Sequence, residues 1–373
     1  MNKINVLHII PGLGIGGAEK VVLGLHQFTD QEHFKTRIIH WGEQHAMQSQ
    51  AAFSDQAIIQ QKLDKVFSVD TIRKLIRVVR DNHIDIIQTH LIDADLLGFV
   101  VSLLTRKPVI ITIHSYPFPT ETRHGLRYRL ISFFDSRFIC VSYMVKDHFG
   151  CVTGIEPDRI DVLHNGIHLA EFSKEVSDEV RTNLRRYFSI PGDHNVVGTV
   201  ARLIEDKGHR YLLLAVPRII EAHPNTTFLI IGDGELKPTL IAMCEDLNIQ
   251  KHVIFTGSRT DIPDLLEIMD IFVYPTFREA LGIAVIEAMA TGKAIVATDD
   301  ASIPELITSG KEGMLIHPGD PQGIAAAVID LLASPKKRQT LGKAAKQKAA
   351  FFSIDLMARK MEEIYRQVFA QSP

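Results

Sequence analysis

Two glutamates, Glu279 and Glu287, stand eight positions apart in a stretch that runs from Pro275 to Gly292. The apolar, β-branched run Ile271–Val273 predicts a short buried strand, which Pro275 ends because proline has no N–H for a strand ladder. The apolar positions that follow repeat with helical spacing, and Gly292 is a typical residue to close a helix. We therefore predict a strand, a tight loop and a helix, with Glu279 in the loop and Glu287 one turn inside the helix.

The start of this helix is a candidate site for an anion. The first backbone N–H groups of a helix have no partner within it, and here they belong to Leu281–Ala284, among them Gly282 and Ile283. A carboxylate accepts hydrogen bonds from two hydroxyl groups, so an acid on each side of a bound diphosphate could hold one sugar ring. Ribose, diphosphate and hexose in that order make a nucleotide sugar. The alternative is that Glu279 is an acid favoured by the helix dipole and that Glu287 lies on a solvated face.

Two cations, Arg202 and Lys207, stand five positions apart between a predicted strand, 195–201, and a predicted helix, 208–222. In a strand-to-helix loop this spacing lets both side chains reach one anion at the carboxyl end of the strand. Negative charge grows on a nucleoside diphosphate as it leaves, and two cations stabilise that charge. The alternative is a pair of surface cations without a ligand.

Predicted strands alternate with predicted helices along the chain, which indicates parallel sheets covered by helices. Ligands of such sheets bind at the carboxyl ends of the strands. His90 and His114 each stand at the end of a predicted strand in the first half of the chain. Their position makes both of them candidate site residues, although a lone histidine is more often structural.

A glycine-rich loop follows the first predicted strand, Asn5–Ile10. Gly12, Gly14 and Gly17 match the G-x-G-x-x-G fingerprint of dinucleotide-binding proteins, which requires an acid about 20 residues further on. Glu43 stands later than that. The alternatives are a substrate that approaches the backbone of the glycines at a helix start, and a plain tight turn.

The chain resembles the retaining glycosyltransferases of family 4, the group 1 or glycogen-synthase-like enzymes with the GT-B fold. The resemblance covers essentially the whole chain. It is carried, in the expected order, by Gly-Gly-Ala-Glu from Gly16, Thr-Ile-His at His114, Asn-Gly at Asn165, Arg…Lys-Gly from Arg202, and the Glu-x7-Glu of Glu279 and Glu287. Two places depart from the family pattern. His164 and His168 replace a proline and an aspartate in the segment between the domains, and Ala301 and Ser302 stand where relatives often have glycines.

The resemblance implies a role for each matched residue. The expected catalytic residues are His114 and Glu279, and Glu279 is expected to bind the transferred sugar. The expected ligands of the donor diphosphate are Arg202, Lys207, Gly16, Gly17, Leu281, Gly282 and Ile283. The nucleoside is expected at Glu287, Gly232 and Gly234, and the acceptor side at Gly14 and His90.

The implied reaction moves a hexose from a nucleotide diphosphate sugar to an acceptor hydroxyl, with retention at the anomeric carbon. A UDP-sugar is favoured over a GDP-sugar, and the expected acceptor is a lipid-linked or cell-surface glycan in polysaccharide biosynthesis. The family is held to work without a metal ion, so no metal or other cofactor is expected. Three alternatives stay open: a nucleotide-sugar epimerase of the same fold, an NAD-dependent dehydrogenase that uses the loop from Gly12 to Gly17, and a sugar-nucleotide sensor without turnover.

The expected architecture is α/β, with two Rossmann-like βαβ domains that face each other across a cleft. An N-terminal, acceptor-binding domain spans residues 1–170 and includes the last helix, 354–373, which crosses back to it in this fold. A C-terminal domain that binds the nucleotide sugar spans residues 176–351. In a chain of 373 residues, each domain is large enough for a core of its own.

The composition is that of an ordinary globular protein, with 46% hydrophobic residues, 23% charged residues and a net charge of −3. Nucleic-acid-binding domains are usually strongly basic, so no nucleic acid partner is expected. The three cysteines are scattered, which indicates a reducing compartment and no metal cluster. The N-terminus lacks a signal-peptide core and no apolar run reaches about 18 residues, so we expect a cytoplasmic protein.

Two basic segments are candidates for contact with a membrane. Arg73, Arg77 and Arg80 recur at helical spacing, and Arg123–Phe134 is basic and aromatic together. Such surfaces can lie on anionic lipid, which would place the protein at the inner face of the cell membrane. The alternative is a solvated helix face whose arginine stems cover apolar surface.

Overall fold

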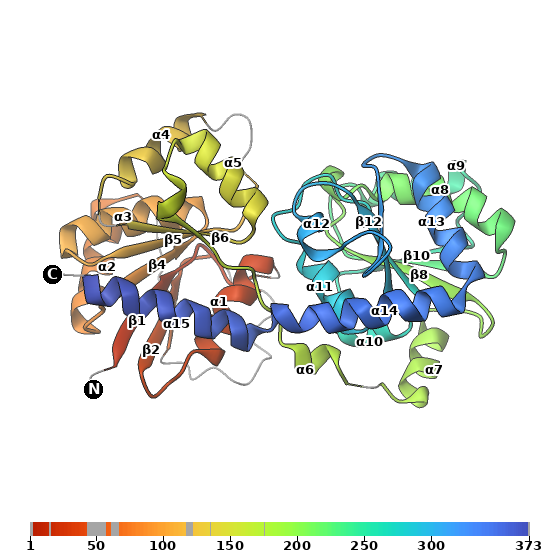
Figure 1. Ribbon diagram of the computed structural model, residues 1–373, viewed down its shortest axis with the longest axis horizontal. Coiled ribbons are helices and arrows are strands. Elements are labelled where there is room, and N and C mark those ends of the chain that lie inside the picture. The colour runs from red at the N-terminus through yellow and green to blue at the C-terminus, as the bar shows by residue number, and fades with distance from the viewer. Residues whose placement is uncertain are drawn as a thin grey trace. The chain divides into compact units, whose positions relative to one another are not determined.

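The computed structural model of the protein describes residues 3–14, 16–42, 57–60, 67–116, 122–134, 136–174 and 176–371. They form two compact units (Figure 1). The first unit comprises Met1–Ile167 together with Ser353–Pro373, and the second comprises His168–Phe352. The sequence placed the domain ends at 170 and 351 and the last helix in the first domain.

The first unit contains a parallel sheet with the strand order β3-β2-β1-β4-β5-β6-β7. Its strands are β1 (Ile4–Ile9), β2 (Phe34–His40), β3 (Ile58–Gln60), β4 (Ile86–His90), β5 (Val109–Ile113), β6 (Ser136–Cys140) and β7 (Ile160–Val162). Its helices are α1 (Gly17–Phe28), α2 (Val69–Asp81), α3 (Ile92–Thr105), α4 (Thr122–Ile131), α5 (Tyr143–Thr153), the short 3-10 helix η3 (Pro157–Arg159) and α15 (Ile354–Gln371). β4 and β5 are buried along their whole length, as expected for central parallel strands with helices on both faces.

The second unit contains a parallel sheet with the strand order β10-β9-β8-β11-β12-β13. Its strands are β8 (Asn195–Val200), β9 (Thr226–Ile231), β10 (Val253–Gly257), β11 (Ile271–Tyr274), β12 (Ala294–Thr298) and β13 (Met314–Ile316). Its helices are α6 (Leu169–Phe172), α7 (Asp178–Tyr187), α8 (His209–Ala222), α9 (Lys237–Asp246), α10 (Ile262–Glu267), α11 (Ile283–Ala290), α12 (Ile303–Leu306), α13 (Pro321–Ala333) and α14 (Pro335–Ala349), with 3-10 helices η4 (Glu205–Lys207) and η5 (Ala350–Phe352). The prediction of two Rossmann-like parallel sheets is confirmed.

Each sheet reverses its strand order at one point, between β1 and β4 in the first unit and between β8 and β11 in the second. The loops on the two sides of such a point leave in opposite directions, and ligands of open α/β sheets bind there, beyond the carboxyl ends of the strands. The carboxyl ends of these four strands and of their neighbours β5 and β9, with the loops that follow them, therefore position the candidate site residues.

The last helix, α15, packs on α1 and β4 of the first unit (Figure 1). Its Tyr365 hydroxyl donates a hydrogen bond to the buried side chain of Gln88 in β4. The Glu362 carboxylate accepts the backbone N–H of Asp30 at 2.9 Å. The expected return of the C-terminal helix to the N-terminal domain is confirmed.

Among the described residues, the α-helices that the sequence did not predict include α5, α6, α9, α10 and α12. In α9 only Leu240 and Cys244 are buried, and α10 is six residues long. Such short helices bury too few side chains to show a clear 3.6-residue period. Asp320 caps α13, because its carboxylate accepts the N–H of Gly323 at 2.9 Å.

Candidate active site

Glu279 lies in the loop between β11 and α11, and its carboxylate receives two strong hydrogen bonds on one oxygen. The Tyr274 hydroxyl donates to Oε2 at 2.5 Å, and the Lys207 ammonium donates to the same atom at 2.6 Å. The Lys207 and Glu279 side chains are only 14% and 16% exposed. The Ser302 hydroxyl also donates to the Glu279 backbone carbonyl at 3.0 Å. Both the side chain and the backbone of Glu279 are thus held in place.

Lys207 reaches Glu279 because the loops after β8 and β11 are joined to each other. The backbone N–H of Phe277 donates to the Asp206 carbonyl at 2.8 Å, and the Thr276 hydroxyl donates to the same carbonyl at 3.0 Å. Gly208 follows with φ +65°, and a Cβ there would lie 1.9 Å from the Pro275 carbonyl oxygen. Only glycine allows this approach. The sequence assigned Lys207 to the diphosphate and Glu279 to the sugar, and the structure pairs them.

Tyr274 is the residue of this site that the sequence reading missed. It is the last residue of β11 and only 4% exposed. Burial first, and then the charge of Glu279, raises the pKa of its hydroxyl well above the ordinary value, so the hydroxyl stays a donor. The charges of Glu287 and Arg202 also act on Tyr274, so it lies among the candidate residues. A hydroxyl-bearing side chain at the carboxyl end of a buried strand was the available signal.

The helix start after Glu279 corrects one expectation. Gly282, with φ +90°, is the N-cap of α11, and the helix begins at Ile283. Leu281 therefore lies outside the helix and does not supply one of its N-terminal N–H groups, whereas Ile283 does. Glu287 lies in α11 and is 3% exposed, so the alternative that it occupies a solvated face is wrong.

Arg202 and the two glycines after β9 occupy neighbouring loops. Arg202 is exposed just beyond the end of β8. A Cβ at Gly232 would lie 1.9 Å from the Ala201 carbonyl oxygen, and one at Gly234 would lie 2.5 Å from that of Leu203. Both glycines are therefore required by backbone packing against the Arg202 loop. That Gly232 and Gly234 border the nucleoside stays a prediction.

In the first unit, three histidines form a hydrogen-bonded chain across β1, β4 and the end of β5. His8 Nδ1 lies 3.1 Å from His90 Nε2, and His90 Nδ1 lies 2.8 Å from His114 Nε2. The sequence indicated His90 and His114 but not His8, which stands in an apolar strand and looked like part of the core. The structure brings the two predicted histidines into direct contact.

Burial keeps these imidazoles neutral. It lowers the pKa of His8 to about 3, with a further contribution from His26, and that of His114 to about 4. Burial also holds the pKa of His90 well below its ordinary value. A neutral imidazole has one N–H, so the two hydrogen bonds must run in the same direction along the chain. The tautomer of His114 is thus tied to that of His8 through His90.

The glycine-rich loop of the first unit leads into α1. Gly16 is the N-cap and Gly17 the first helical residue. A Cβ at Gly16 would lie 2.2 Å from the Glu19 carboxylate, whereas one at Gly14 would meet no described atom within 4 Å. Because the flexible Glu19 side chain can move away, steric packing requires a glycine neither at position 16 nor at position 14. Glu43, the acid weighed for the dinucleotide fingerprint, lies outside the described residues.

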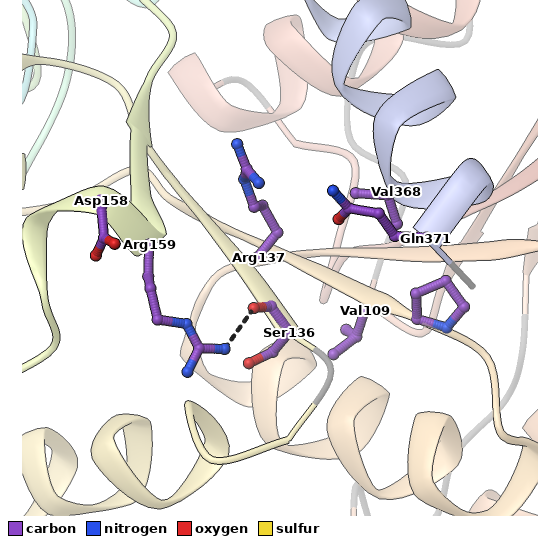
Figure 2. Close-up of a pocket in the computed structure, with 8 residues that line it drawn as sticks. Val109, Ser136, Arg137, Asp158, Arg159, Val368 and Gln371 are labelled. Carbon is purple, nitrogen blue, oxygen red and sulfur yellow. Dashed lines mark hydrogen bonds between the residues drawn. The ribbon is translucent and has the colours of Figure 1, made fainter. Parts of the chain in front are cut away.

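A cavity of about 190 Å³ lies at the opposite, amino-terminal edge of the first sheet, between the starts of β5 and β6 and the end of α15 (Figure 2). Its Arg137 pairs with Asp161 at 2.5 Å. Its Arg159 donates to the carbonyls of Phe134 and Ser136 at 3.3 and 3.4 Å. Because both arginines are engaged and the strands end at the other edge, this cavity is not the candidate active site.

Among the described residues, one group of side chains has metal-ligand spacing: Asp30, Glu32 and His33, near the surface at the end of α1. The Asp-Ala-Asp sequence at the start of α3 offers no open ligand pair. The Asp95 carboxylate is buried and accepts hydrogen bonds from Thr89 at 2.6 Å and Tyr128 at 2.7 Å.

The fold defines a class of protein. A crystal structure of Anabaena HepE in complex with UDP and glucose matches the chain with a TM-score of 0.86 at 20% identity, and covers 98% of this chain and 100% of that one. A glycosyltransferase structure from Rickettsia africae matches with a TM-score of 0.86 at 19% identity, and covers 100% of both chains. The two units therefore make a GT-B fold.

The family follows from the sequence models. The model of glycosyl transferases group 1 matches residues 180–348, and the model of glycosyltransferase family 4 matches residues 15–171. The chain belongs to the family 4, group 1 glycosyltransferases. The glycosyltransferase prediction is thus confirmed, in place of the NAD-dependent dehydrogenase.

Curated relatives agree with this assignment. An uncharacterized glycosyltransferase of Methanocaldococcus jannaschii is 26% identical over 313 residues, which cover 81% of this chain and 80% of that one. A UDP-Gal:alpha-D-GlcNAc-diphosphoundecaprenol alpha-1,3-galactosyltransferase of Escherichia coli is 27% identical over 266 residues, 68% of each chain.

Proposed function

We propose that this glycosyltransferase moves a hexose from a nucleotide diphosphate sugar, with a UDP-sugar favoured over a GDP-sugar, to an acceptor hydroxyl with retention and without a metal ion. The observation that carries the proposal is the fixed carboxylate of Glu279. It lies beside Lys207 at the point where the strand order of the second sheet reverses. The carboxylate can accept hydrogen bonds from the hydroxyl groups of a hexose, and the neighbouring cation can bind the diphosphate to which the hexose is joined.

In this proposal each end of the donor has its own residues. Lys207, Arg202 and the N–H of Ile283 bind the diphosphate, and Glu287 accepts hydrogen bonds from the ribose. Glu279 accepts hydrogen bonds from the hexose. The two cations supply the charge stabilisation that a metal would otherwise supply.

The first unit contributes the acceptor side and His114. His114 contacts the hexose near its reacting carbon, while His90 and Gly14 border the acceptor. Because burial holds the pKa of His114 near 4, the ring acts as a neutral hydrogen-bonding group. It therefore does not serve as a cation for the diphosphate.

The chemical step breaks the bond between the anomeric carbon and the diphosphate oxygen and forms a bond to the acceptor oxygen on the same face. The acceptor proton passes to the leaving phosphate oxygen. Glu279 is engaged by Lys207 and Tyr274 on one oxygen, which favours a binding role over that of a covalent nucleophile.

A thermal-shift screen against UDP, GDP, ADP, NAD and their sugar conjugates tests the donor site. A ligand at a hundredfold excess over its Kd stabilises the folded protein by about 2.7 kcal/mol. We expect a shift with UDP and its conjugates. A shift with NAD alone would overturn the proposal, and a shift with GDP would change only the base. Release of free sugar or of an epimer without an acceptor would favour an epimerase. Binding of the nucleotide sugar without any turnover would favour a sensor.

We also propose a lipid-linked acceptor and a peripheral contact of the first unit with anionic membrane. The apolar side chains of Leu126, Leu130, Phe133 and Phe134, in and just after α4, are exposed. In the same segment Arg127 lines a small pocket with Phe67 and Ile92, which are also exposed. The relative from Escherichia coli has a lipid-linked acceptor in its name.

None of the described helices is long and apolar enough to cross a bilayer. Arg73, Arg77 and Arg80 are exposed on α2, whose start carries the exposed Phe67 and Val69 nearby. Pelleting with vesicles that contain phosphatidylglycerol checks the proposal. Reversing the charge of the three arginines should abolish pelleting, while Lys336→Glu on α14 of the second unit is the matched control. Equal pelleting of all variants would remove the membrane contact.

A further inference from the structure

Glu279 holds its two donors in different ways. Tyr274 is a buried residue of β11, and its backbone pairs with Ala297 of β12, so the packed ring has little freedom to carry the hydroxyl away from Glu279. Lys207 ends the short 3-10 helix η4, and its ammonium sits on a flexible four-carbon stem. The tyrosine is therefore a fixed partner of the carboxylate and the lysine a mobile one.

We propose that Lys207 exchanges between the Glu279 carboxylate and the donor diphosphate, while Tyr274 is the positioning residue that keeps Glu279 in place during the exchange. The inference rests on the proposed nucleotide-sugar site. Lys207 and Tyr274 share Oε2 at 2.6 and 2.5 Å, and the ammonium lies 5.8 Å from the centre of the tyrosine ring. All three side chains belong to the second unit.

The exchange distinguishes a nucleotide sugar from the bare nucleotide. A bound diphosphate draws Lys207 from Glu279, which leaves a shielded carboxylate with fewer donors than before. Leaving such a group short of partners is unfavourable. The hydroxyl groups of a hexose replace the lost donor, but a nucleoside diphosphate without sugar offers none there. The site therefore binds the donor in preference to the product.

Product release follows from the same competition. When the hexose has moved to the acceptor, Glu279 loses the hydroxyl groups and Lys207 returns to it. The diphosphate then loses one of its cations. The ion pair between Lys207 and Glu279 thus serves to expel the spent nucleotide.

Isothermal titration of UDP and UDP-glucose, without acceptor, tests the exchange. In Glu279→Gln the competing charge is gone and the shape is kept, so UDP should bind about tenfold tighter, the equivalent of one hydrogen bond to a charged group. The affinity for UDP-glucose should not rise, because the glutamine amide is a poorer hydrogen-bond partner for the hydroxyl groups of the hexose. The preference for UDP-glucose over UDP should therefore fall by about tenfold or more.

Tyr274→Phe should act in a different way. UDP affinity should stay within about twofold, because a carboxylate that Tyr274 no longer holds can turn to water when Lys207 leaves it. UDP-glucose affinity and kcat should each fall about tenfold, since Glu279 is no longer positioned once Lys207 has left. A merely structural role of Tyr274 would weaken both ligands alike, and that result would overturn its assignment.

Two variants serve as controls. Tyr211→Phe removes another tyrosine hydroxyl of the second unit, and Asp330→Asn removes a negative charge from an exposed ion pair with Lys337. Both should bind UDP and UDP-glucose as the wild type does. UDP affinity that is unchanged or weaker in Glu279→Gln would overturn the exchange alone. Wild-type protein that binds neither UDP nor GDP would overturn the proposed function together with it. If GDP binds instead, GDP and GDP-mannose replace the UDP probes.

Discussion

At the scale of single residues, the two cations expected to hold the diphosphate are not equivalent. Lys207 is paired with Glu279, whereas Arg202 is exposed at the end of β8. Lys207 must give up a partner to bind a diphosphate, and this loss offsets part of what it gains. The interaction with the ligand is therefore worth more at Arg202.

Arg202→Ala should accordingly weaken UDP binding more than Lys207→Ala does. A hydrogen bond to a charged group contributes about 1.5–3 kcal/mol, and we expect the arginine variant to lose an amount in this range and the lysine variant less. Titration calorimetry of both variants checks the order. The reverse order would mean that Lys207 is the main ligand and that its pairing with Glu279 has no energetic effect.

The histidine chain makes a second prediction for single residues. His8, His90 and His114 should not titrate above about pH 5, because burial holds the pKa of His8 at about 3, that of His114 at about 4, and that of His90 low as well. Nitrogen-detected NMR of the imidazole rings, recorded from pH 8 to pH 5, measures this. The same protein in urea, where histidines titrate near 6.5, is the reference. A midpoint between 6 and 7 for any of the three rings would contradict it.

At the scale of elements, the active-site loops of the second unit depend on one close backbone contact. Gly208 has φ +65° and would place a Cβ 1.9 Å from the Pro275 carbonyl oxygen. Gly310 has φ +80° but would place its Cβ near no described atom. The two glycines therefore separate the effect of backbone strain from that of a clash.

Gly310→Ala should lower the free energy of unfolding by about 1–2 kcal/mol, the cost of a left-handed residue with a side chain. Gly208→Ala should lower it further and should also weaken UDP binding, because the loop that carries Lys207 must move. Urea denaturation and UDP titration of both variants check this. Equal stability of the two variants would mean that the backbone at Pro275 moves away from the new Cβ without loss of stability.

The elements were largely predictable, and the contacts between them were not. Apolar runs, prolines and helix caps gave the strands and most helices, since these signals are local in the sequence. The sequence did not indicate Tyr274, because its hydroxyl reaches Glu279 only after the loop folds back on itself. The sequence did not indicate His8 either, because its contact with His90, 82 positions away, depends on β1 and β4 being neighbours in the sheet. Nothing local to either strand specifies that order.

At the scale of the whole molecule, acid should act more strongly on the first unit than on the second. In the first unit, burial lowers the pKa of His8, His90 and His114, and also that of His26 and His40. Among the described residues of the second unit, the comparable histidine is His209, with a pKa lowered to about 4 by burial and by Lys207. Asp95 of the first unit acts in the opposite sense, because burial raises its pKa to about 7.

Acid lowers the free energy of unfolding of the first unit because its unfolded chain binds more protons than its folded form. Between about pH 6.5 and pH 4 the unfolded chain binds protons at His8 and His114 and the folded chain does not. Each such histidine therefore lowers the free energy of unfolding by about 1.4 kcal/mol per pH unit as the pH falls. Asp95 offsets only one of them.

Trp41, the single tryptophan, lies just after β2 and reports on the first unit alone. Its fluorescence transition in urea should move to lower urea between pH 7.5 and pH 5, and by more than the transition of the second unit. Circular dichroism, which follows both units, provides the comparison. A tryptophan transition that keeps its midpoint in acid would contradict the prediction.

The position of α15 has a consequence for the order of synthesis. The whole of the second unit, His168–Phe352, leaves the ribosome before the segment that completes the first. Until then Gln88 has no Tyr365, and the apolar surface that receives Met357, Met361 and Val368 is uncovered. The half of the protein that is translated first is thus finished last. A nascent chain released at residue 352 would carry a complete second unit beside an unfinished first one.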